Sequence, residues 1–211
     1  ITVSCAEGEK GKVYKGLIPF HVKKTRLDQI SDTKTAIMVN IADPTIAFLY
    51  GRLPHDGVGL ARMEFIINNT IKIHPLFLLE LDKPVEKRSI TVSDDLAEQA
   101  KKITRGYKNC KEYYIHKLSL GIAMITSAFY PKPVILRFSD FKSNEYKNLI
   151  GGSFFEPIES NPMLGWRGAS RYYDKAFMPA FQMECAAVKR VRDVLGLANL
   201  NVMIPFCRTP E

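Results

Sequence analysis

Short apolar segments alternate with stretches of helical periodicity through most of the chain. Apolar residues three or four positions apart along residues 111–129 predict a helix with one buried face. Strands that alternate with helices favour parallel β/α units, arranged either as a doubly wound sheet or as a barrel. The pattern therefore predicts an α/β fold. The predicted strands of this region are residues 36–40, 57–61, 134–138, 163–168 and 201–206.

The sequence also marks where helices begin and end. Asp43 followed by Pro44 predicts a helix start, because aspartate caps free N–H groups and proline fits the first turn. A second helix is expected from about Met63. A third is expected over residues 174–195, where the following Gly196 is a favoured stop.

The first part of the chain has a different pattern. Within residues 1–23, the segments 1–5 and 12–20 are β-prone and flank a turn, which predicts a hairpin. A lone hairpin is marginal in water, so we expect this one to belong to a larger sheet. Residues 24–35 are polar and predict a linker between the hairpin and the β/α region at 36–211.

The number of β/α units favours a barrel that is incomplete. We count about five units, whereas an eight-unit barrel typically takes ~250 residues. No Gly-x-Gly-x-x-Gly loop follows the first predicted strand, which argues against a dinucleotide-binding fold. The chain lacks an initiator methionine, and residues 209–211 have the form of a helix start. We therefore expect the chain to be part of a longer protein.

The charge and composition of the chain limit the kinds of molecule that it could bind. The net charge of +8 is compatible with nucleic acid, a membrane surface or an anionic substrate. The densest basic groups, residues 101–105 and 189–192, fall on helical patterns and are interpreted as solvated helix faces. No apolar run approaches the ~20 residues of a membrane span, and no aromatic-interleaved nucleic-acid motif is present. We expect neither nucleic acid nor a membrane as a partner.

The cysteines and histidines show no metal-type spacing. The four cysteines are scattered, which is typical of a reduced, cytoplasmic protein rather than a disulfide scaffold. The four histidines do not form a ligand motif such as His-Glu-x-x-His. The sequence therefore predicts no zinc site.

Three arginines stand at the ends of predicted strands: Arg62, Arg137 and Arg167. Ligands of parallel β/α folds bind at the carboxyl ends of strands, and guanidinium groups match the oxygens of phosphate or carboxylate. Each arginine could instead pair with a carboxylate, such as Arg62 with Glu64 or Arg137 with Asp140. Three arginines at equivalent positions favour an anion site.

The arginines lie in three segments that together resemble the PEP-utilising enzymes. These are residues 53–67 (Leu-Pro-His-Asp-Gly-Val-Gly-Leu-Ala-Arg-Met-Glu-Phe-Ile-Ile), 137–146 (Arg-Phe-Ser-Asp-Phe-Lys-Ser-Asn-Glu-Tyr) and 161–168 (Asn-Pro-Met-Leu-Gly-Trp-Arg-Gly). The family includes phosphoenolpyruvate synthases, pyruvate phosphate dikinases and enzyme I of the sugar phosphotransferase system. Residues 139–146 resemble the synthase branch, and residues 3–8 are similar to the closing hairpin of its swivelling phosphohistidine domain.

The resemblance implies a fold and a reaction. Residues 36–211 would be the N-terminal portion of a (β/α)8 TIM-type barrel that binds pyruvate and phosphoenolpyruvate, and residues 1–23 would end the phosphohistidine domain. ATP, pyruvate and water would give phosphoenolpyruvate, AMP and phosphate through a phosphohistidine, with Mg²⁺ at the barrel. The implied site residues are Arg62, Arg137 and Arg167 for the phosphoryl group and enolate oxygen, supported by Asp140, Lys142 and Glu64.

Some features of the family are missing from this sequence. None of the four histidines lies in the Thr-Cys-His type motif that carries the phosphoryl group. By the resemblance, the Mg²⁺ ligands and the cysteine acid would lie beyond Glu211, and the ATP-binding domain is absent. Cys207 follows the last predicted strand, but a buried and inert thiol is the expected interpretation. We expect this chain to be inactive alone and, as in family members, to form a homodimer.

Two alternatives stay open. The chain could come from a pyruvate phosphate dikinase or an enzyme I relative, which differ from the synthase in the acceptor. It could also be a non-catalytic basic module that binds RNA or an acidic partner. A salt-dependent nucleic-acid affinity that survives loss of all three arginines would favour this last interpretation.

Overall fold

A computed structural model describes most of the chain, and its contacts divide the chain into two compact units. The units are Ile1–Asp32 and Thr33–Glu211. The residues described are 1–24, 26–27, 33–161, 163 and 165–209.

The first unit contains the predicted hairpin. Strands β1 (Thr2–Ser4) and β2 (Lys12–Tyr14) pair antiparallel, with Val3 opposite Val13. Both valines are exposed. The prediction of a hairpin is confirmed, although both strands are shorter than the β-prone segments of the sequence.

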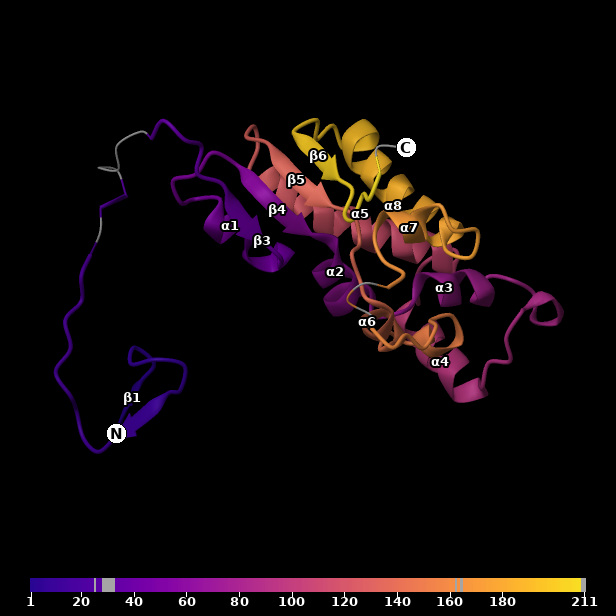
Figure 1. Cartoon of the computed structure of the whole chain (residues 1–211), viewed down its shortest axis with the longest axis horizontal. Coiled ribbons are helices and arrows are strands. Elements are labelled where there is room, and N and C mark those ends of the chain that lie inside the picture. Colours follow the sequence, from indigo (N-terminus) through magenta and orange to yellow (C-terminus); the bar gives the residue numbers. More distant parts are fainter. Residues whose placement is uncertain (25, 28–32, 162, 164, 210–211) are drawn as a thin grey trace. The chain divides into compact units, whose positions relative to one another are not determined.

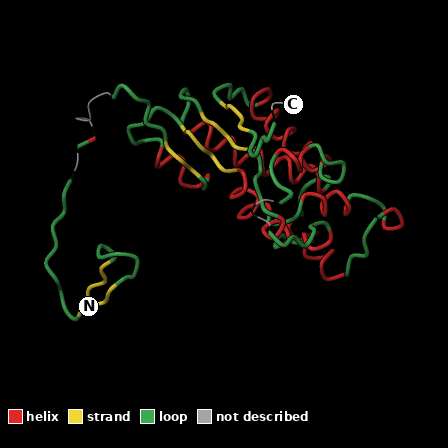
Figure 2. The backbone as a smooth tube through the Cα atoms, viewed as in Figure 1, coloured by secondary structure: helices red, strands yellow, loops and turns green. Residues whose placement is uncertain are grey.

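The second unit is built on a parallel four-stranded sheet. Its strands are β3 (Val39–Ile41), β4 (Val58–Arg62), β5 (Val134–Arg137) and β6 (Leu200–Met203). They lie side by side in the order of the chain, β3-β4-β5-β6 (Figures 1 and 2). The prediction of an α/β fold with parallel strands is confirmed by this sheet.

The prediction of a strand at 163–168 is wrong for the residues of this segment that the structure describes. They form turns, bends and irregular backbone. Gly168 has a φ of 62°, which a strand cannot accommodate. The Trp166 N–H donates to the Glu159 carboxylate at 2.8 Å instead of to a neighbouring strand. The segment is a loop held by side chains.

Helices connect and cover the strands. The predicted cap is present, because the Asp43 carboxylate accepts a hydrogen bond from the Thr45 N–H at 2.8 Å. The predicted start at Met63 is also present. The α-helices are α1 (Ala47–Tyr50), α2 (Met63–Ile66), α3 (Pro75–Leu81), α4 (Asp94–Ile103), α5 (Cys110–Ala128), α6 (Ser143–Lys147), α7 (Ala169–Tyr172) and α8 (Met178–Lys189). Short 3-10 helices span Pro44–Ile46, Val85–Lys87 and Gly152–Phe154, and π-helical turns span Ile67–Ile71 and Arg190–Val194.

The two long predicted helices agree closely with the sequence pattern. Helix α5 corresponds to the helix expected at 111–129. Its first turn is capped, because the Asn109 side chain accepts a hydrogen bond from the Glu112 N–H at 2.7 Å. Helix α8 and its π-helical turn occupy most of the expected 174–195, and Gly196 follows with a φ of 71°. No helix in the described ranges is long and apolar enough to cross a membrane. The predicted helix start at 209–211 lies largely outside the described residues.

The core lies between one face of the sheet and the helices. Val58, Val134, Leu136 and Leu200 are buried on this face, which is covered by helices including α5 (Figure 1). Asn201, which alternates with Leu200 along β6, is exposed. This arrangement leaves the carboxyl ends of β4 and β5 open at one edge of the sheet.

Candidate functional site

Arg62 and Arg137 are neighbours because the strands that carry them, β4 and β5, pair in the sheet. Arg62 is the last residue of β4, Arg137 is the last residue of β5, and the two are register partners in the parallel ladder. Arg167 reaches the same region from the loop before α7, rather than from the strand that the sequence predicted. Two of the three arginines therefore occupy equivalent strand ends, and the third does not.

All six residues predicted from the sequence line one pocket. Its volume is about 260 Å³. Four cationic side chains and three carboxylates face it, so the charges nearly balance. The lining consists of Arg62, Glu64, Phe65, Asn68, Arg137, Asp140, Phe141, Lys142, Glu145 and Arg167.

Asp140 is the centre of the charged network. Its two carboxylate oxygens accept from Nε and Nη2 of Arg167, each at 2.9 Å, in the paired geometry typical of strong arginine–carboxylate contacts. Arg137 Nη1 lies 3.1 Å from the same carboxylate. The Asp140 side chain is only 2% exposed. The carboxylate thus fixes two guanidinium groups at once.

Glu64 extends this network to β4 and α2. Its Oε1 accepts from Arg137 Nη2 at 2.8 Å and from the Asp140 N–H at 2.6 Å. Burial raises the pKa of Glu64 above its usual value, although Arg137 acts in the opposite direction. Glu64 Oε2 and Arg137 Nε are buried with no hydrogen-bond partner among the described residues. Two polar groups at the pocket therefore have unused hydrogen-bonding capacity.

Arg62 differs from the other two arginines. Its side chain is exposed, and no hydrogen bond or ion pair joins it to another residue in the described part of the chain. The alternative pairing of Arg137 with Asp140 is thus present, whereas the pairing of Arg62 with Glu64 is not. Arg62 is a cation that lines the pocket with its donors unused.

Lys142 and Glu145 stand at the rim of the pocket. Lys142 Nζ lies 3.7 Å from Glu145 Oε1, at the start of α6, and both side chains are partly exposed. Such an exposed pair contributes little to stability. Lys142 can therefore turn towards an anion in the pocket at small cost.

Behind Asp140, a buried cluster holds the end of β5 and was not predicted from the sequence. Glu184 on α8 accepts from the Ser139 hydroxyl at 2.5 Å and from the Ser139 N–H at 3.3 Å. The Tyr172 hydroxyl donates to the Ser139 carbonyl at 2.5 Å, and Ser139 Oγ lies 2.8 Å from the Tyr146 hydroxyl. Since Ser139 precedes Asp140, this cluster fixes the backbone that carries the central carboxylate. The only signal in the sequence is a single carboxylate within an apolar helix.

A pH dependence of stability follows from the burial of Glu184. Burial raises the pKa of Glu184 to about 7 from its ordinary 4.5, so the folded state favours the protonated form. This contribution to stability is fully present below about pH 4.5 and is lost as the pH rises through about 7. The loss corresponds to about 3 kcal/mol.

Urea unfolding of the chain at a series of pH values tests this prediction. Glu184→Gln is expected to flatten the decline of the unfolding free energy across this window, because glutamine carries no titrating proton. The exposed Glu98→Gln is the control, since Glu98 lies on the surface of α4 in a pair with Lys102. A Glu184→Gln variant with the unchanged slope would contradict the prediction.

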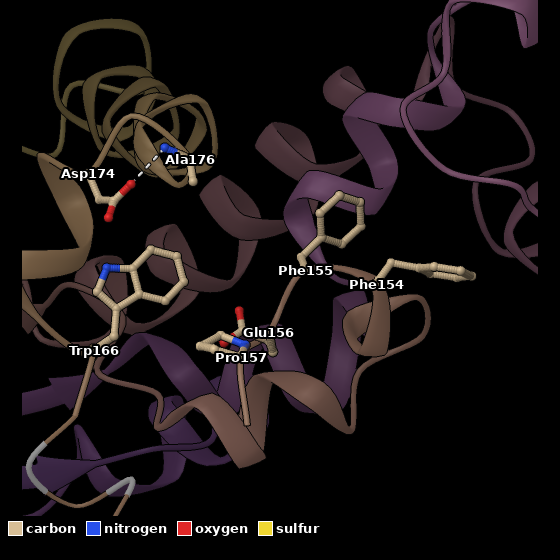
Figure 3. Close-up of a pocket in the computed structure, with 7 residues that line it drawn as sticks. All are labelled: Phe154, Phe155, Glu156, Pro157, Trp166, Asp174 and Ala176. Carbon is tan, nitrogen blue, oxygen red and sulfur yellow. Dashed lines mark hydrogen bonds between the residues drawn. The ribbon is translucent and has the colours of Figure 1, made fainter. Parts of the chain in front are cut away.

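A second buried cluster lies next to Arg167. It comprises His74, Glu156 and Arg171, and Arg171 is the largest fully buried side chain among the described residues. Glu156 and Trp166 also line a separate, open pocket of about 420 Å³ (Figure 3). The sequence offers a weak signal for this cluster, because Arg171 is a second arginine shortly after Arg167.

Comparisons with known proteins identify the same family along nearly the whole chain. Residues 21–211 match the family described as PEP-utilising enzyme, PEP-binding domain. Phosphoenolpyruvate synthase of Aquifex aeolicus is 52% identical over all of this chain and 29% of the relative. Phosphoenolpyruvate synthases of Synechocystis sp. and Escherichia coli are 51% and 48% identical over all of this chain and 25% and 26% of the relatives. The chain spans about a quarter of the length of these curated relatives.

Proposed function

The chain belongs to the family of PEP-utilising enzymes, and from this premise we propose that it is part of a phosphoenolpyruvate synthase. The reaction converts pyruvate, ATP and water to phosphoenolpyruvate, AMP and phosphate in the cytoplasm. The identity of about half of all positions to synthases supports this proposal. The observation that carries it is the gathering of Arg62, Arg137 and Arg167 at one pocket.

The proposed fold is the first part of a (β/α)8 barrel, formed by residues 36–211. Because residues 163–168 form no strand where they are described, the parallel sheet supplies four strands to this barrel rather than the five that the sequence predicted. The order of the strands supports it, because a doubly wound sheet reverses its order at a switch point whereas neighbouring barrel strands follow the chain. We assign residues 1–23 to the closing hairpin of the phosphohistidine domain and residues 24–35 to a linker. That domain would be the partner that delivers the phosphoryl group.

The three arginines would bind the phosphoryl group and the developing enolate oxygen. Phosphoryl transfer depends mainly on positioning and on stabilising negative charge that is spread over several oxygens. Arg137 and Arg167 are held in place before any ligand arrives, by Asp140 and Glu64. Arg62 has unused donors and would supply the cation that closes on the ligand. Lys142 would add positive charge at the rim.

The residues present do not fit a resident Mg²⁺. Across the described ranges, no three or more histidine, cysteine, aspartate and glutamate side chains are grouped closely enough to hold a metal ion. Within the pocket, Glu64 and Asp140 are already engaged by arginines. The role proposed for this chain therefore contains no step through a metal, and Mg²⁺ and ATP follow only from the proposed parent reaction.

The acceptor of the second phosphoryl group separates the alternatives within the family. A synthase transfers this group to water and releases phosphate, whereas a dikinase transfers it to phosphate and releases pyrophosphate. The names of the similar curated proteins favour the synthase. Assay of the intact gene product with pyruvate and ATP is expected to yield AMP and phosphate without dependence on added phosphate. Pyrophosphate formation would instead favour a dikinase.

Arg62→Ala is expected to remove function without affecting folding. The substitution deletes a cation at the pocket, which should lower the turnover of the intact gene product by about 10²–10³-fold. The unfolding free energy should change by no more than ~0.5 kcal/mol, since Arg62 is exposed and has no partner in the described chain.

Arg52→Ala is the matched control, because Arg52 is another exposed arginine and does not line the pocket. It should leave both turnover and stability unchanged. Full turnover in Arg62→Ala would refute the assignment of this pocket to the substrate.

A further inference from the structure

Arg171 is a buried cation whose three guanidinium nitrogens all donate hydrogen bonds. Its Nη1 and Nη2 donate to the two carboxylate oxygens of Glu156 at 2.6 and 2.8 Å. His74 Nε2 lies 3.0 Å from Glu156 Oε1. The Arg171 guanidinium lies over the ring of Trp166, with 4.1 Å between Cζ and the ring centroid. Arg171 does not line the arginine pocket, so a role at the site must act through other groups.

Arg171 holds the peptide group that precedes Arg167. Its Nε and Nη2 donate to the Trp166 carbonyl at 3.2 and 3.0 Å. The Trp166 N–H donates to Glu159 Oε1 at 2.8 Å, so the backbone of Trp166 is fixed on both sides. The side chains of Trp166 and Glu156 both line the open pocket (Figure 3). The backbone that leads into Arg167 thus has little freedom to move.

The same guanidinium also binds the first residue of α6. Arg171 Nη2 donates to Ser143 Oγ at 3.2 Å, and Ser143 donates to Glu159 Oε2 at 2.5 Å. Ser143 directly follows Lys142, which lines the pocket. One buried side chain therefore connects the loop that carries Arg167 to the segment that carries Lys142.

The protonation states in this cluster agree with its geometry. Burial alone would raise the pKa of Glu156, but hydrogen bonds from His74 and Arg171 outweigh it and lower the pKa below its ordinary value. Burial lowers the pKa of His74 despite the neighbouring Glu156. An ionised Glu156 faces Arg171, and a neutral His74 can donate from Nε2 while its Nδ1 accepts from the Leu76 N–H at 3.3 Å.

Stability alone is a weak explanation for such a cluster. A buried ion pair is often no more stabilising than apolar residues of similar volume, because both charges lose their hydration. A displacement of about 1 Å at a reacting group can lower a rate by about 10²-fold. A rigid connection to the Arg167 loop would therefore affect catalysis more than folding.

We propose that Arg171 is a positioning residue that fixes the Arg167 guanidinium through the backbone of Trp166, and that Glu156 orients Arg171. The inference rests on the proposed function, because its effect is on the transfer of a phosphoryl group at the arginine pocket. A lysine at position 171 keeps the charge but cannot bind Glu156, Ser143 and the Trp166 carbonyl together.

The test uses Arg171→Lys and the double variant Arg171→Met/Glu156→Gln in the intact gene product. The double variant removes both buried charges together, which protects folding. For both variants kcat is expected to fall about 10–100-fold, while KM for pyruvate changes only a few-fold. A merely structural role would lower the amount of folded enzyme and leave the kcat of the folded fraction unchanged. The fraction folded is measured by thermal unfolding and circular dichroism.

Arg88→Lys is the matched control. Arg88 also donates to backbone carbonyls, those of Lys83 and Leu81 at 3.3 and 3.1 Å, but it does not line the arginine pocket. Its kcat should match that of the unmodified protein. If both position-171 variants keep full kcat while Arg62→Ala loses it, the inference is overturned and the proposed function stands. If Arg62→Ala also keeps full kcat, the proposed function fails.

Discussion

Arg167→Ala is expected to lower the unfolding free energy of the chain by about 3 kcal/mol and to remove turnover in the intact gene product. Breaking a buried ion pair typically costs about 3–5 kcal/mol, because the remaining charge stays buried without compensation. Asp140 would keep Arg137 at 3.1 Å, so the lower end of this range applies. The contact of the guanidinium with the Phe206 ring, at 4.3 Å from the centroid, would also be lost.

Denaturation in urea and steady-state assays measure the two effects separately. Arg167→Lys is the informative companion variant, since it keeps the charge but cannot form the paired contact with Asp140. Compared with Arg167→Ala, Arg167→Lys should recover part of the lost unfolding free energy but little of the lost turnover. An Arg167→Ala variant as stable as the unmodified chain would show that Asp140 is not held as the structure indicates.

The hydrogen bond to Asp140 also raises the pKa of Arg167, so the guanidinium stays charged at any pH at which the protein is folded. Arg62, by contrast, has no partner in the described chain to remove. We therefore expect the Arg167 substitution to lower both stability and turnover, and the Arg62 substitution to lower turnover alone. This difference would distinguish a cation fixed by the protein from one that is free to bind a ligand.

The sequence predicted which side chains meet at one pocket better than it predicted the path of the chain. Arg62 and Arg137 could be predicted as neighbours, because the carboxyl ends of adjacent parallel strands must lie together. Arg167 was predicted at the end of a strand, yet it lies on a loop and contacts the same Asp140 as Arg137. An apolar run predicts burial, but Gly168 and side-chain contacts within the loop decide its course. The contact of Arg167 with Asp140 also joins residues on different elements, which no short window of sequence can show.

The ends of helices could be predicted because their signals are local. Asp43, Asn109 and Gly196 act within one turn of their own positions, so their effect can be seen in a short window of sequence. Arg171 and Glu184 depend on partners on other elements, and charged residues in a helical pattern are usually solvated. Sequence patterns therefore identified the side chains that face the pocket but missed the buried groups that support them.

The charges around the pocket bear on the kind of anion that we propose it binds. Two of its arginines are largely neutralised by Asp140 and Glu64, so the pocket does not act as a simple patch of positive charge. Three groups could bind an anion: Arg62, the buried Nε of Arg137, and Lys142, which is held only by a long contact of 3.7 Å with Glu145. Such an arrangement favours a ligand that can use several specific donors over an anion that is attracted only by charge.

Asp140→Ala is expected to be the most damaging single change at the site, because it removes the carboxylate that two arginines share and leaves Arg137 with Glu64 alone. Arg137 and Arg167 would face each other without the carboxylate between them, which should cost about 4 kcal/mol in unfolding free energy. Turnover of the intact gene product should fall by at least ~10³-fold. Asp193→Asn, a change at an exposed carboxylate outside the arginine pocket, is the control and should alter neither quantity.

Asp140→Asn separates the charge of this residue from its shape. Asparagine keeps one acceptor for Arg167, so this variant should be more stable than Asp140→Ala. Removing the negative charge should also strengthen the binding of inorganic phosphate several-fold, measured by calorimetry, although turnover falls. Tighter binding with slower turnover is expected if the carboxylate orients the arginines for the transition state rather than for the ground state. Weaker phosphate binding, or undiminished turnover, would contradict this role of Asp140.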